Sequence, residues 1–232
     1  MNVAGAVHLS TVDWFGKSAM VIFLRGCPLR CKHCHNADYR AGNTQVELDE
    51  IAHWVETAVP FIGALVLSGG EPMMQPDSVK ALVELARRNG LKVAVETSGF
   101  YPINPDMFDM VFLSVKTQLE DEAYKAWTGH PMALSNLISN LQVLSPEKTE
   151  IRFTVFEDSN YGTSVFGIFR KYKMRFLRGD NLSQEMLCDM ANYVATLLDY
   201  HVEQEGESYL VSASMSIRRC DLIDQDCTKY SR

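Results

Sequence analysis

The chain has 232 residues, of which 47% are hydrophobic and 22% are charged, and its formal net charge is −7. This is ordinary globular composition and enough length for one full core, while the negative charge argues against a nucleic-acid substrate, which needs a basic face. The sequence has no run of the roughly 18 apolar residues that a membrane span needs, and the first ten residues lack the pattern of an export signal, so we expect a cytoplasmic protein without a membrane partner.

Short apolar runs alternate along the chain with longer helical patterns. The runs are rich in Val, Ile, Leu or Phe, as in strands that are covered on both faces. Strands are predicted at 20–25, 64–68, 92–97, 110–115, 151–156 and 174–177, and helices at 48–58, 76–89, 120–127, 135–144, 161–170 and 183–199. Strands that alternate with helices predict right-handed crossovers and a parallel sheet. Six such units predict an α/β fold, a partial (β/α)6 barrel of the TIM-like type.

A single domain is expected over residues 1–232, because the sequence contains neither a linker nor a low-complexity segment. Its barrel core is predicted over about 18–199, and a C-terminal extension over about 200–232, where the alternation ends. Residues 208–217 are predicted to form a terminal strand. Gly90 follows the second predicted helix and is expected to end it, as glycine does after many helices.

Three cysteines follow the first predicted strand with the spacing C-x3-C-x2-C: Cys27, Cys31 and Cys34. Three thiolates on one short loop can hold three irons of a cubane [4Fe–4S] cluster and leave the fourth iron open to a small molecule. A zinc site completed by His33 or His35 is a second interpretation, although zinc usually takes two separated ligand pairs. Structural thiols without a metal are a third.

The cysteine loop resembles the signature of the radical S-adenosylmethionine (SAM) superfamily. Two flanking segments, 10–17 and Cys34-His35-Asn36, resemble its glycyl-radical-enzyme activating branch, which includes pyruvate formate-lyase activating enzyme and the anaerobic ribonucleoside-triphosphate reductase activating proteins. The resemblance runs from about Ser10 to about Val155. It implies the radical SAM type of partial barrel, a [4Fe–4S] cluster on the three cysteines, and SAM on the open iron. His33 stands where the family usually has an aromatic residue, and we expect its flat ring to tune the cofactor contact.

Further candidate residues follow the second and third predicted strands, at the end of the barrel where α/β enzymes place their chemistry. In Ser68-Gly69-Gly70-Glu71-Pro72 the resemblance assigns Gly69, Gly70 and Glu71 to the amino group of SAM. A plain turn is the alternative for this motif. In Glu96-Thr97-Ser98-Gly99 it assigns a SAM contact to Ser98, with Glu96 bracing the loop.

Two cations complete the candidate site. Lys116 ends the fourth strand, where activating enzymes commonly have Asp-x-Lys, although Ser114 replaces the acid. Lys116 is expected to bind the SAM carboxylate or a substrate carbonyl. Arg152, on the fifth strand, resembles the family arginine that pairs with the SAM carboxylate, since a guanidinium can bind a carboxylate through two parallel hydrogen bonds. An outward-facing Arg152 is the alternative.

Together these assignments imply an oxidoreductase that reductively cleaves SAM at the cluster to a 5′-deoxyadenosyl radical. The expected protein substrate is a glycyl radical enzyme such as anaerobic ribonucleotide reductase, and the expected electron donor is flavodoxin or ferredoxin. The chemistry requires no protein base, and none is assigned. Two alternatives stay open: a radical SAM enzyme acting on a small molecule or modified nucleoside, similar to 7-carboxy-7-deazaguanine synthase, and a non-catalytic metal-binding module. Cys188 is expected to be a buried helix residue. Cys220 and Cys227 are expected to bind nothing, and an auxiliary cluster or a redox pair are the alternatives for them.

Overall fold

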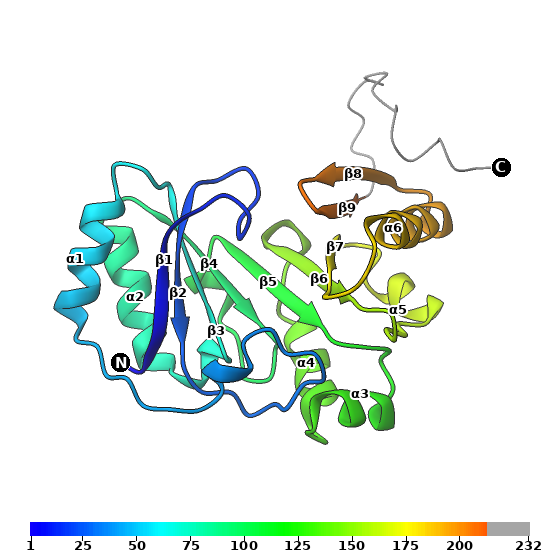
Figure 1. Ribbon diagram of the computed structural model, residues 1–232, viewed down its shortest axis with the longest axis horizontal. Coiled ribbons are helices and arrows are strands. Elements are labelled where there is room, and N and C mark those ends of the chain that lie inside the picture. Colours follow the sequence, from blue (N-terminus) through cyan, green and yellow to red (C-terminus); the bar gives the residue numbers. More distant parts are fainter. Residues whose placement is uncertain (213–232) are drawn as a thin grey trace. The chain divides into compact units, whose positions relative to one another are not determined.

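The computed structural model describes residues 1–212, and the chain divides into two compact units, of which the first is Met1–Glu150 and the second begins at Ile151. Figure 1 labels their elements. Among the described residues, no helix is both long enough and apolar enough to cross a membrane.

The first unit contains five strands that pair in the order β1-β2-β3-β4-β5. Its strands are β1 (Val3–Ser10), β2 (Ala19–Leu24), β3 (Ala64–Gly69), β4 (Lys92–Thr97) and β5 (Met110–Val115). Strands β2 to β5 pair in parallel in chain order, and their register aligns Leu24 with Gly69 and Thr97 with Leu113. Strand β1 is antiparallel to β2 and lies at the edge. The C-terminal ends of four successive strands therefore lie along one edge of the sheet.

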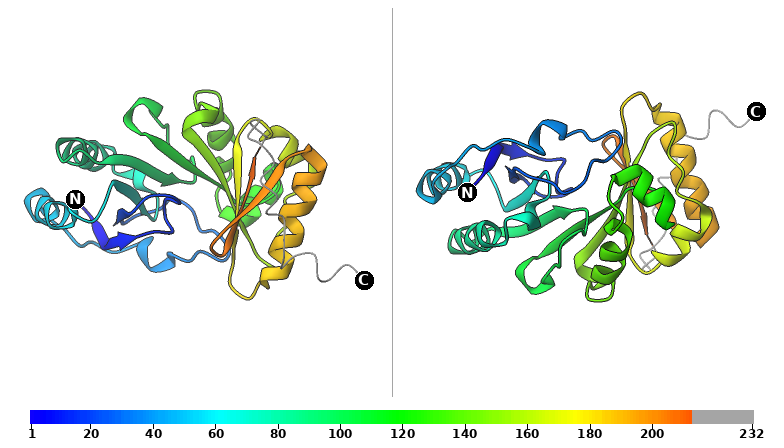
Figure 2. Two further views of the ribbon diagram at one scale, coloured as in Figure 1. Left: turned by 90° about the horizontal axis from the view of Figure 1, so that it is seen from above. Right: turned by 90° about the horizontal axis from the view of Figure 1, so that it is seen from below.

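Four helices accompany this sheet: α1 (Leu48–Ala58), α2 (Pro76–Arg88), α3 (Asp121–Thr128) and α4 (Ala133–Leu141). Helices α1 and α2 pack against each other, and α2 also packs against β3 and β4 (Figure 2). Pro76 occupies the first turn of α2, where its missing N–H costs nothing. Gly90 follows the helix with a φ of 71°, which confirms its predicted role in ending α2.

The second unit contains strands that pair in the order β6-β7-β9-β8. Its elements are β6 (Thr149–Val155, which begins at the last two residues of the first unit), α5 (Thr163–Ile168), β7 (Lys173–Arg178), α6 (Gln184–Leu198), β8 (His201–Glu205) and β9 (Ser208–Ser212). Strand β9 is antiparallel to both β7 and β8. Aromatic rings fill the core of this unit, where Phe153 stacks on Phe176 at 5.2 Å and meets Phe166 and Phe169 edge-on.

Every predicted strand and helix is present, with its ends shifted by at most three residues. The part of the predicted terminal strand that the structure describes is β9, and residues 213–217 lie outside the described range. Two strands were missed. Strand β1 is rich in Ala and Gly and has no run of β-branched residues, and β8 (HVEQE) is polar and largely exposed, so neither carries an apolar pattern. The single-domain expectation, with its core and extension boundaries, stays a prediction.

Candidate functional site

The three cysteines lie on the loop that follows β2, which we call the cysteine loop (residues 25–36). Cys27, Cys31 and Cys34 are free thiols and are half-buried. The middle of the loop is held by α3, because the backbone N–H of Arg30 donates to the carbonyl of Thr128 at 2.7 Å and that of Lys32 donates to the carbonyl of Trp127 at 2.9 Å. These bonds anchor the loop between its first and third cysteines to a neighbouring helix end.

The two glycines of the Gly-Gly-Glu-Pro segment bring the end of β3 against the start of the cysteine loop. Gly69 has a φ of +130°, and a Cβ there would lie 2.1 Å from the carbonyl oxygen of Leu24. A Cβ on Gly70 would lie 2.3 Å from the carbonyl oxygen of Gly26 and 3.2 Å from the Cβ of Cys27. Without side chains the backbones bond directly: Gly70 N–H donates to Leu24 at 2.9 Å. Only glycine permits this approach.

Asn36 fastens the far end of the cysteine loop to the same glycine corner. Its side-chain amide donates to the carbonyl oxygen of Gly69 at 3.0 Å. Both ends of the loop are therefore held by the end of β3. The Cys-His-Asn segment gives no sign of this role for Asn36, because a bond between residues 33 positions apart leaves no local signal in the sequence.

The carboxylate of Glu71 is fully buried and has four donors within this chain. Its Oε1 accepts from the Thr97 hydroxyl at 2.7 Å and from the Met73 N–H at 3.2 Å, while its Oε2 accepts from the Ser98 N–H at 2.9 Å and from the Ser98 hydroxyl at 2.5 Å. Glu71 thus ties the loop after β3 to the loop after β4. Glu96 accepts a bond from the Ser68 hydroxyl at 3.3 Å, and its expected bracing of the loop stays a prediction. The predicted contact of Glu71 with the SAM amino group stays a prediction.

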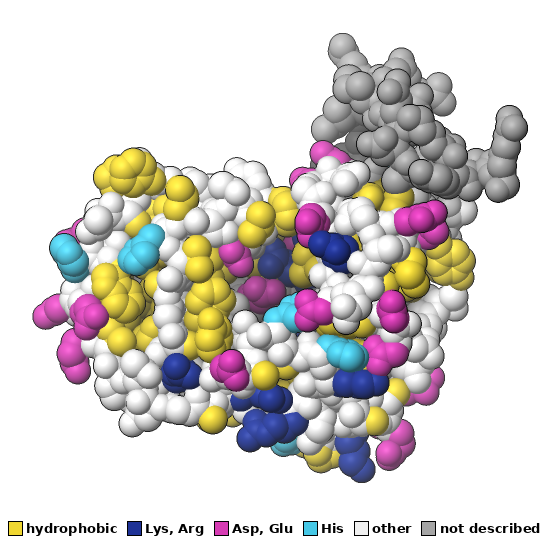
Figure 3. Space-filling model, in the orientation of Figure 1, with side chains coloured by type: hydrophobic (Ala, Val, Ile, Leu, Met, Phe, Trp, Pro, Cys, Tyr) yellow, Lys and Arg dark blue, Asp and Glu magenta, His cyan; other side chains and the backbone are white. Residues whose placement is uncertain are grey.

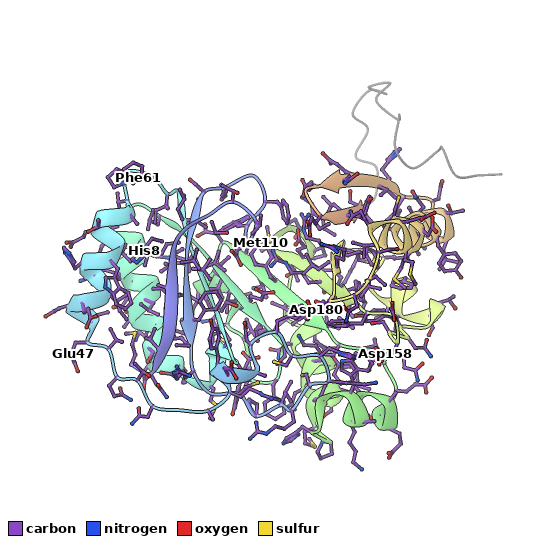
Figure 4. The ribbon with its side chains drawn as sticks, viewed as in Figure 1. His8, Glu47, Phe61, Met110, Asp158 and Asp180 are labelled. Atoms are coloured by element: carbon purple, nitrogen blue, oxygen red, sulfur yellow. The ribbon has the colours of Figure 1, made fainter. Side chains whose placement is uncertain are left out.

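Lys116 lies at the end of β5, on the same edge of the sheet as the cysteine loop. In Figure 4, Met110 marks the opposite end of that strand. Burial raises the pKa of Cys27 to about 11 and also raises the pKa of Cys31, and the positive charge of Lys116 opposes both shifts. The ammonium group is therefore close enough to act on two of the three thiols. A bound metal cation would act in the same direction and more strongly, since coordination deprotonates a thiol.

His33 has a left-handed backbone conformation, with a φ of 54°, and an exposed side chain. Its ring centroid lies 5.9 Å from that of Trp127 on α3, and the ammonium of Lys32 lies 5.3 Å from the same indole. The flat ring expected before the third cysteine is therefore present and packed. Its influence on a cofactor stays a prediction.

Arg152 lies in the second unit, on β6, where residues on both faces of the strand are buried, and its side chain is only 4% exposed. Its predicted pairing with the SAM carboxylate stays a prediction. Cys188 is buried in α6, as expected. Cys220 and Cys227 lie outside the described residues.

A hollow of about 400 Å³ lies beside the loop after β4, between residues 100–103 and the helix α4. Buried Asn140, on α4, holds the loop after β4 in place. Its amide nitrogen donates to the carbonyls of Gly99 and Tyr101, and its Oδ1 accepts from the N–H of Ile103 at 2.8 Å. The loop that carries Ser98 is thus held on one side by Glu71 and on the other by Asn140. Sequence reasoning missed Asn140, since a buried amide within an apolar helix pattern resembles a surface position.

Comparison with known proteins finds a family model that matches part of the chain. Residues 21–117, from β2 to just beyond β5, match the Radical SAM superfamily. That segment contains every predicted site residue except Arg152. Enzymes of this superfamily use a [4Fe–4S] cluster and S-adenosylmethionine, and three free thiols on one loop are the donor set that such a cluster takes when one iron is left open.

Two curated relatives are more specific. A protein of Methanocaldococcus jannaschii, whose name assigns it provisionally to the glycyl-radical enzyme activating enzymes, is 34% identical over 125 residues, which are 51% of each chain. The pyruvate formate-lyase-activating enzyme of Clostridium pasteurianum is 31% identical over 141 residues, which are 55% of this chain and 58% of the relative. The chain thus spans about half the length of the curated relatives that it matches.

A solved structure shares the fold. The structure of TYW1 with a bound lysine–pyruvate adduct aligns with 86% of this chain and 82% of its own, with a TM-score of 0.67 and 13% identity. At that identity the likeness concerns the fold alone. The predicted α/β fold class of the partial-barrel, radical SAM type is confirmed.

Proposed function

We propose that this chain is a radical SAM enzyme in which Cys27, Cys31 and Cys34 hold a [4Fe–4S] cluster and SAM binds the iron that they leave open. The observation that carries the proposal is the C-x3-C-x2-C loop, which is fastened at both ends to the glycine corner after β3. When bound, the cluster and SAM supply a one-electron cleavage of the S–C5′ bond that yields methionine and a 5′-deoxyadenosyl radical.

The chain's own residues position and neutralise the reactants. Glu71 holds the loop that presents Ser98, whose hydroxyl oxygen can still accept a hydrogen bond from a ligand. Lys116 supplies a positive charge beside the thiols, where it can bind the SAM carboxylate. We assign Gly69 and Gly70 to the amino side of SAM and Arg152 to its carboxylate, following the resemblance to the family.

We propose further that the 5′-deoxyadenosyl radical takes a hydrogen atom from a glycine of a partner glycyl radical enzyme. Flavodoxin or ferredoxin is the proposed electron donor. The names of the two relatives support the assignment of the partner, since both are named as activating enzymes. A cytoplasmic location, where reduced carriers of this kind are found, fits the same proposal.

The first test is SAM cleavage by anaerobically reconstituted protein with dithionite as reductant. We expect 5′-deoxyadenosine to form, Cys31→Ala to abolish its formation, and Asp38→Asn, an exposed change close to the same loop, to retain it. Protein that carries zinc and no iron, or that leaves SAM intact, would contradict the proposal and favour the metal-binding module.

The second test concerns the substrate. The reconstituted protein is mixed with SAM and with each glycyl radical enzyme that is encoded beside its gene, and electron paramagnetic resonance is recorded. A glycyl-radical doublet is expected with one of them and not with its Gly→Ala variant. SAM cleavage without any doublet would instead favour a small-molecule or nucleoside substrate.

A further inference from the structure

The cysteine loop and the turn after it are strongly basic in an otherwise acidic chain. Residues 25–41 contain four cations and one acid, although the whole chain has a formal net charge of −7. Arg30 and Lys32 flank Cys31, and Arg40 lies six positions after Cys34; we call these three cations the basic collar. In Figure 3, Lys and Arg side chains gather along the lower edge of the face shown, which is where Figure 1 draws the loop and α3.

The two guanidinium groups of the collar bond to neutral backbone acceptors. Arg30 and Lys32 are exposed and Arg40 is half-buried. Arg30 donates to the carbonyl oxygens of Cys27 and Leu29, each at 3.2 Å, and Arg40 donates to the carbonyl of Ala37 at 3.1 Å. These neutral acceptors orient the guanidinium groups without cancelling their charge. Within residues 1–212, no carboxylate forms an ion pair with Arg30 or Arg40.

The collar is also adjacent to the thiols. Arg40 is close enough for its charge to act on the thiol of Cys31, and Arg30 bonds to the backbone of Cys27. The three cysteines are themselves only half-buried. A protein that approaches this surface therefore comes close to whatever the thiols hold.

We propose that the basic collar is the docking surface for an acidic one-electron carrier protein that reduces the cluster. This inference rests on the proposed function, because it names the partner of the same site. In each encounter the carrier loses one electron and the cluster gains it. The net charge of the rest of the chain is negative and repels such a carrier, so attraction to the collar orients the carrier toward the thiols.

Charge favours a protein partner over a nucleic acid on this surface. Tight binding to nucleic acid neutralises on the order of 6–10 phosphates, which is more than three cations can supply. A weak, salt-sensitive encounter between redox proteins buries a small interface, under about 1,200 Å² in total, and needs only a few opposed charges.

The test compares a protein reductant with a chemical one. The double variant Arg30→Glu and Lys32→Glu is first tested for flavodoxin binding to the cluster-free protein by isothermal titration calorimetry, where weaker binding than that of the unmodified protein is expected and equal binding would overturn the inference. It is then assayed for 5′-deoxyadenosine formation with photoreduced flavodoxin and, separately, with dithionite. The control, Lys80→Glu and Arg88→Glu on α2, makes the same change in net charge at two exposed positions away from the loop. A second double variant, Arg30→Gln and Lys32→Gln, removes the positive charges without adding negative ones. It controls for disruption of the loop by the introduced carboxylates.

We expect kcat/KM for flavodoxin to fall about tenfold or more in the Glu variant at low salt, and less in the Gln variant, as for electrostatically steered association. The difference in kcat/KM between the variants and the unmodified protein should shrink at about 1 M salt, where the Debye length is about 3 Å. Dithionite-driven cleavage should be unchanged in both variants. An unchanged flavodoxin rate, an equal loss in the α2 control, or an equal loss with both reductants would overturn the inference. Absence of cleavage with dithionite in the unmodified protein would overturn the proposed function itself.

Discussion

Replacing Glu71 by glutamine tests whether this carboxylate braces the site or contacts a ligand. The carboxylate is fully buried, and each of its oxygens accepts two hydrogen bonds, from Met73 and Thr97 on one side and from Ser98 on the other. Glutamine has the same shape but only one acceptor oxygen. Its NH2 group must therefore face a pair of donors, and at least one backbone N–H loses its acceptor.

The expected cost follows from that single mismatch. The Thr97 hydroxyl cannot easily become the acceptor for the new NH2 group, because it already accepts from the Gly99 N–H at 3.0 Å. A buried donor left without a partner costs about 1–3 kcal/mol, so we expect Glu71→Gln to lower the free energy of unfolding by about 2 kcal/mol. For a protein of this size that corresponds to a fall of about 4–8 °C in Tm.

Tryptophan fluorescence suits this assay, because all three tryptophans, at positions 14, 54 and 127, lie in the unit Met1–Glu150 that contains Glu71. Glu84→Gln, an exposed change on α2, is the matched control and should stay within about 0.5 kcal/mol of the unmodified protein. If Glu71→Gln leaves stability unchanged but raises the KM for SAM, the bracing argument is refuted and the carboxylate faces the ligand.

Three further predictions concern the loop. Gly70→Ala places a Cβ 2.3 Å from the carbonyl oxygen of Gly26, so iron content after reconstitution should fall severely; full iron loading would contradict the close approach. Asn36→Ala removes the bond to Gly69 and should lower iron content with little effect on Tm, whereas a wild-type iron content would show that the bond is dispensable. Because burial raises the pKa of Cys27 to about 11, its alkylation by iodoacetamide in cluster-free protein at pH 8 should be about 100-fold slower than that of a cysteine with a pKa of 9.0 and should rise about tenfold per pH unit up to about pH 10. Peptide mass spectrometry would measure these rates, and a rate independent of pH would contradict the shift.

The order of the elements was readable from the sequence because buried parallel strands and amphipathic helices leave local patterns. Strands β4 and β5 were predicted at their observed bounds, and so was α1. The same patterns failed for β1 and β8, which lie at the edges of their sheets and need no apolar alternation.

The metal-binding residues of the site were likewise readable from a short stretch of sequence. Three cysteines within eight residues specify a donor set on one loop, whatever the rest of the chain does. The residues that hold the loop were not readable in this way. Glu71 accepts hydrogen bonds from Thr97 and Ser98, and Asn36 donates one to Gly69, across separations of 26 to 33 positions. Such partners meet only after the parallel strands have brought their ends to one edge of the sheet. Sequence alone determined which atoms are available to bind a metal, because that depends on residue type and spacing; tertiary structure decided which polar groups are already occupied, because a hydrogen bond between distant residues depends on packing.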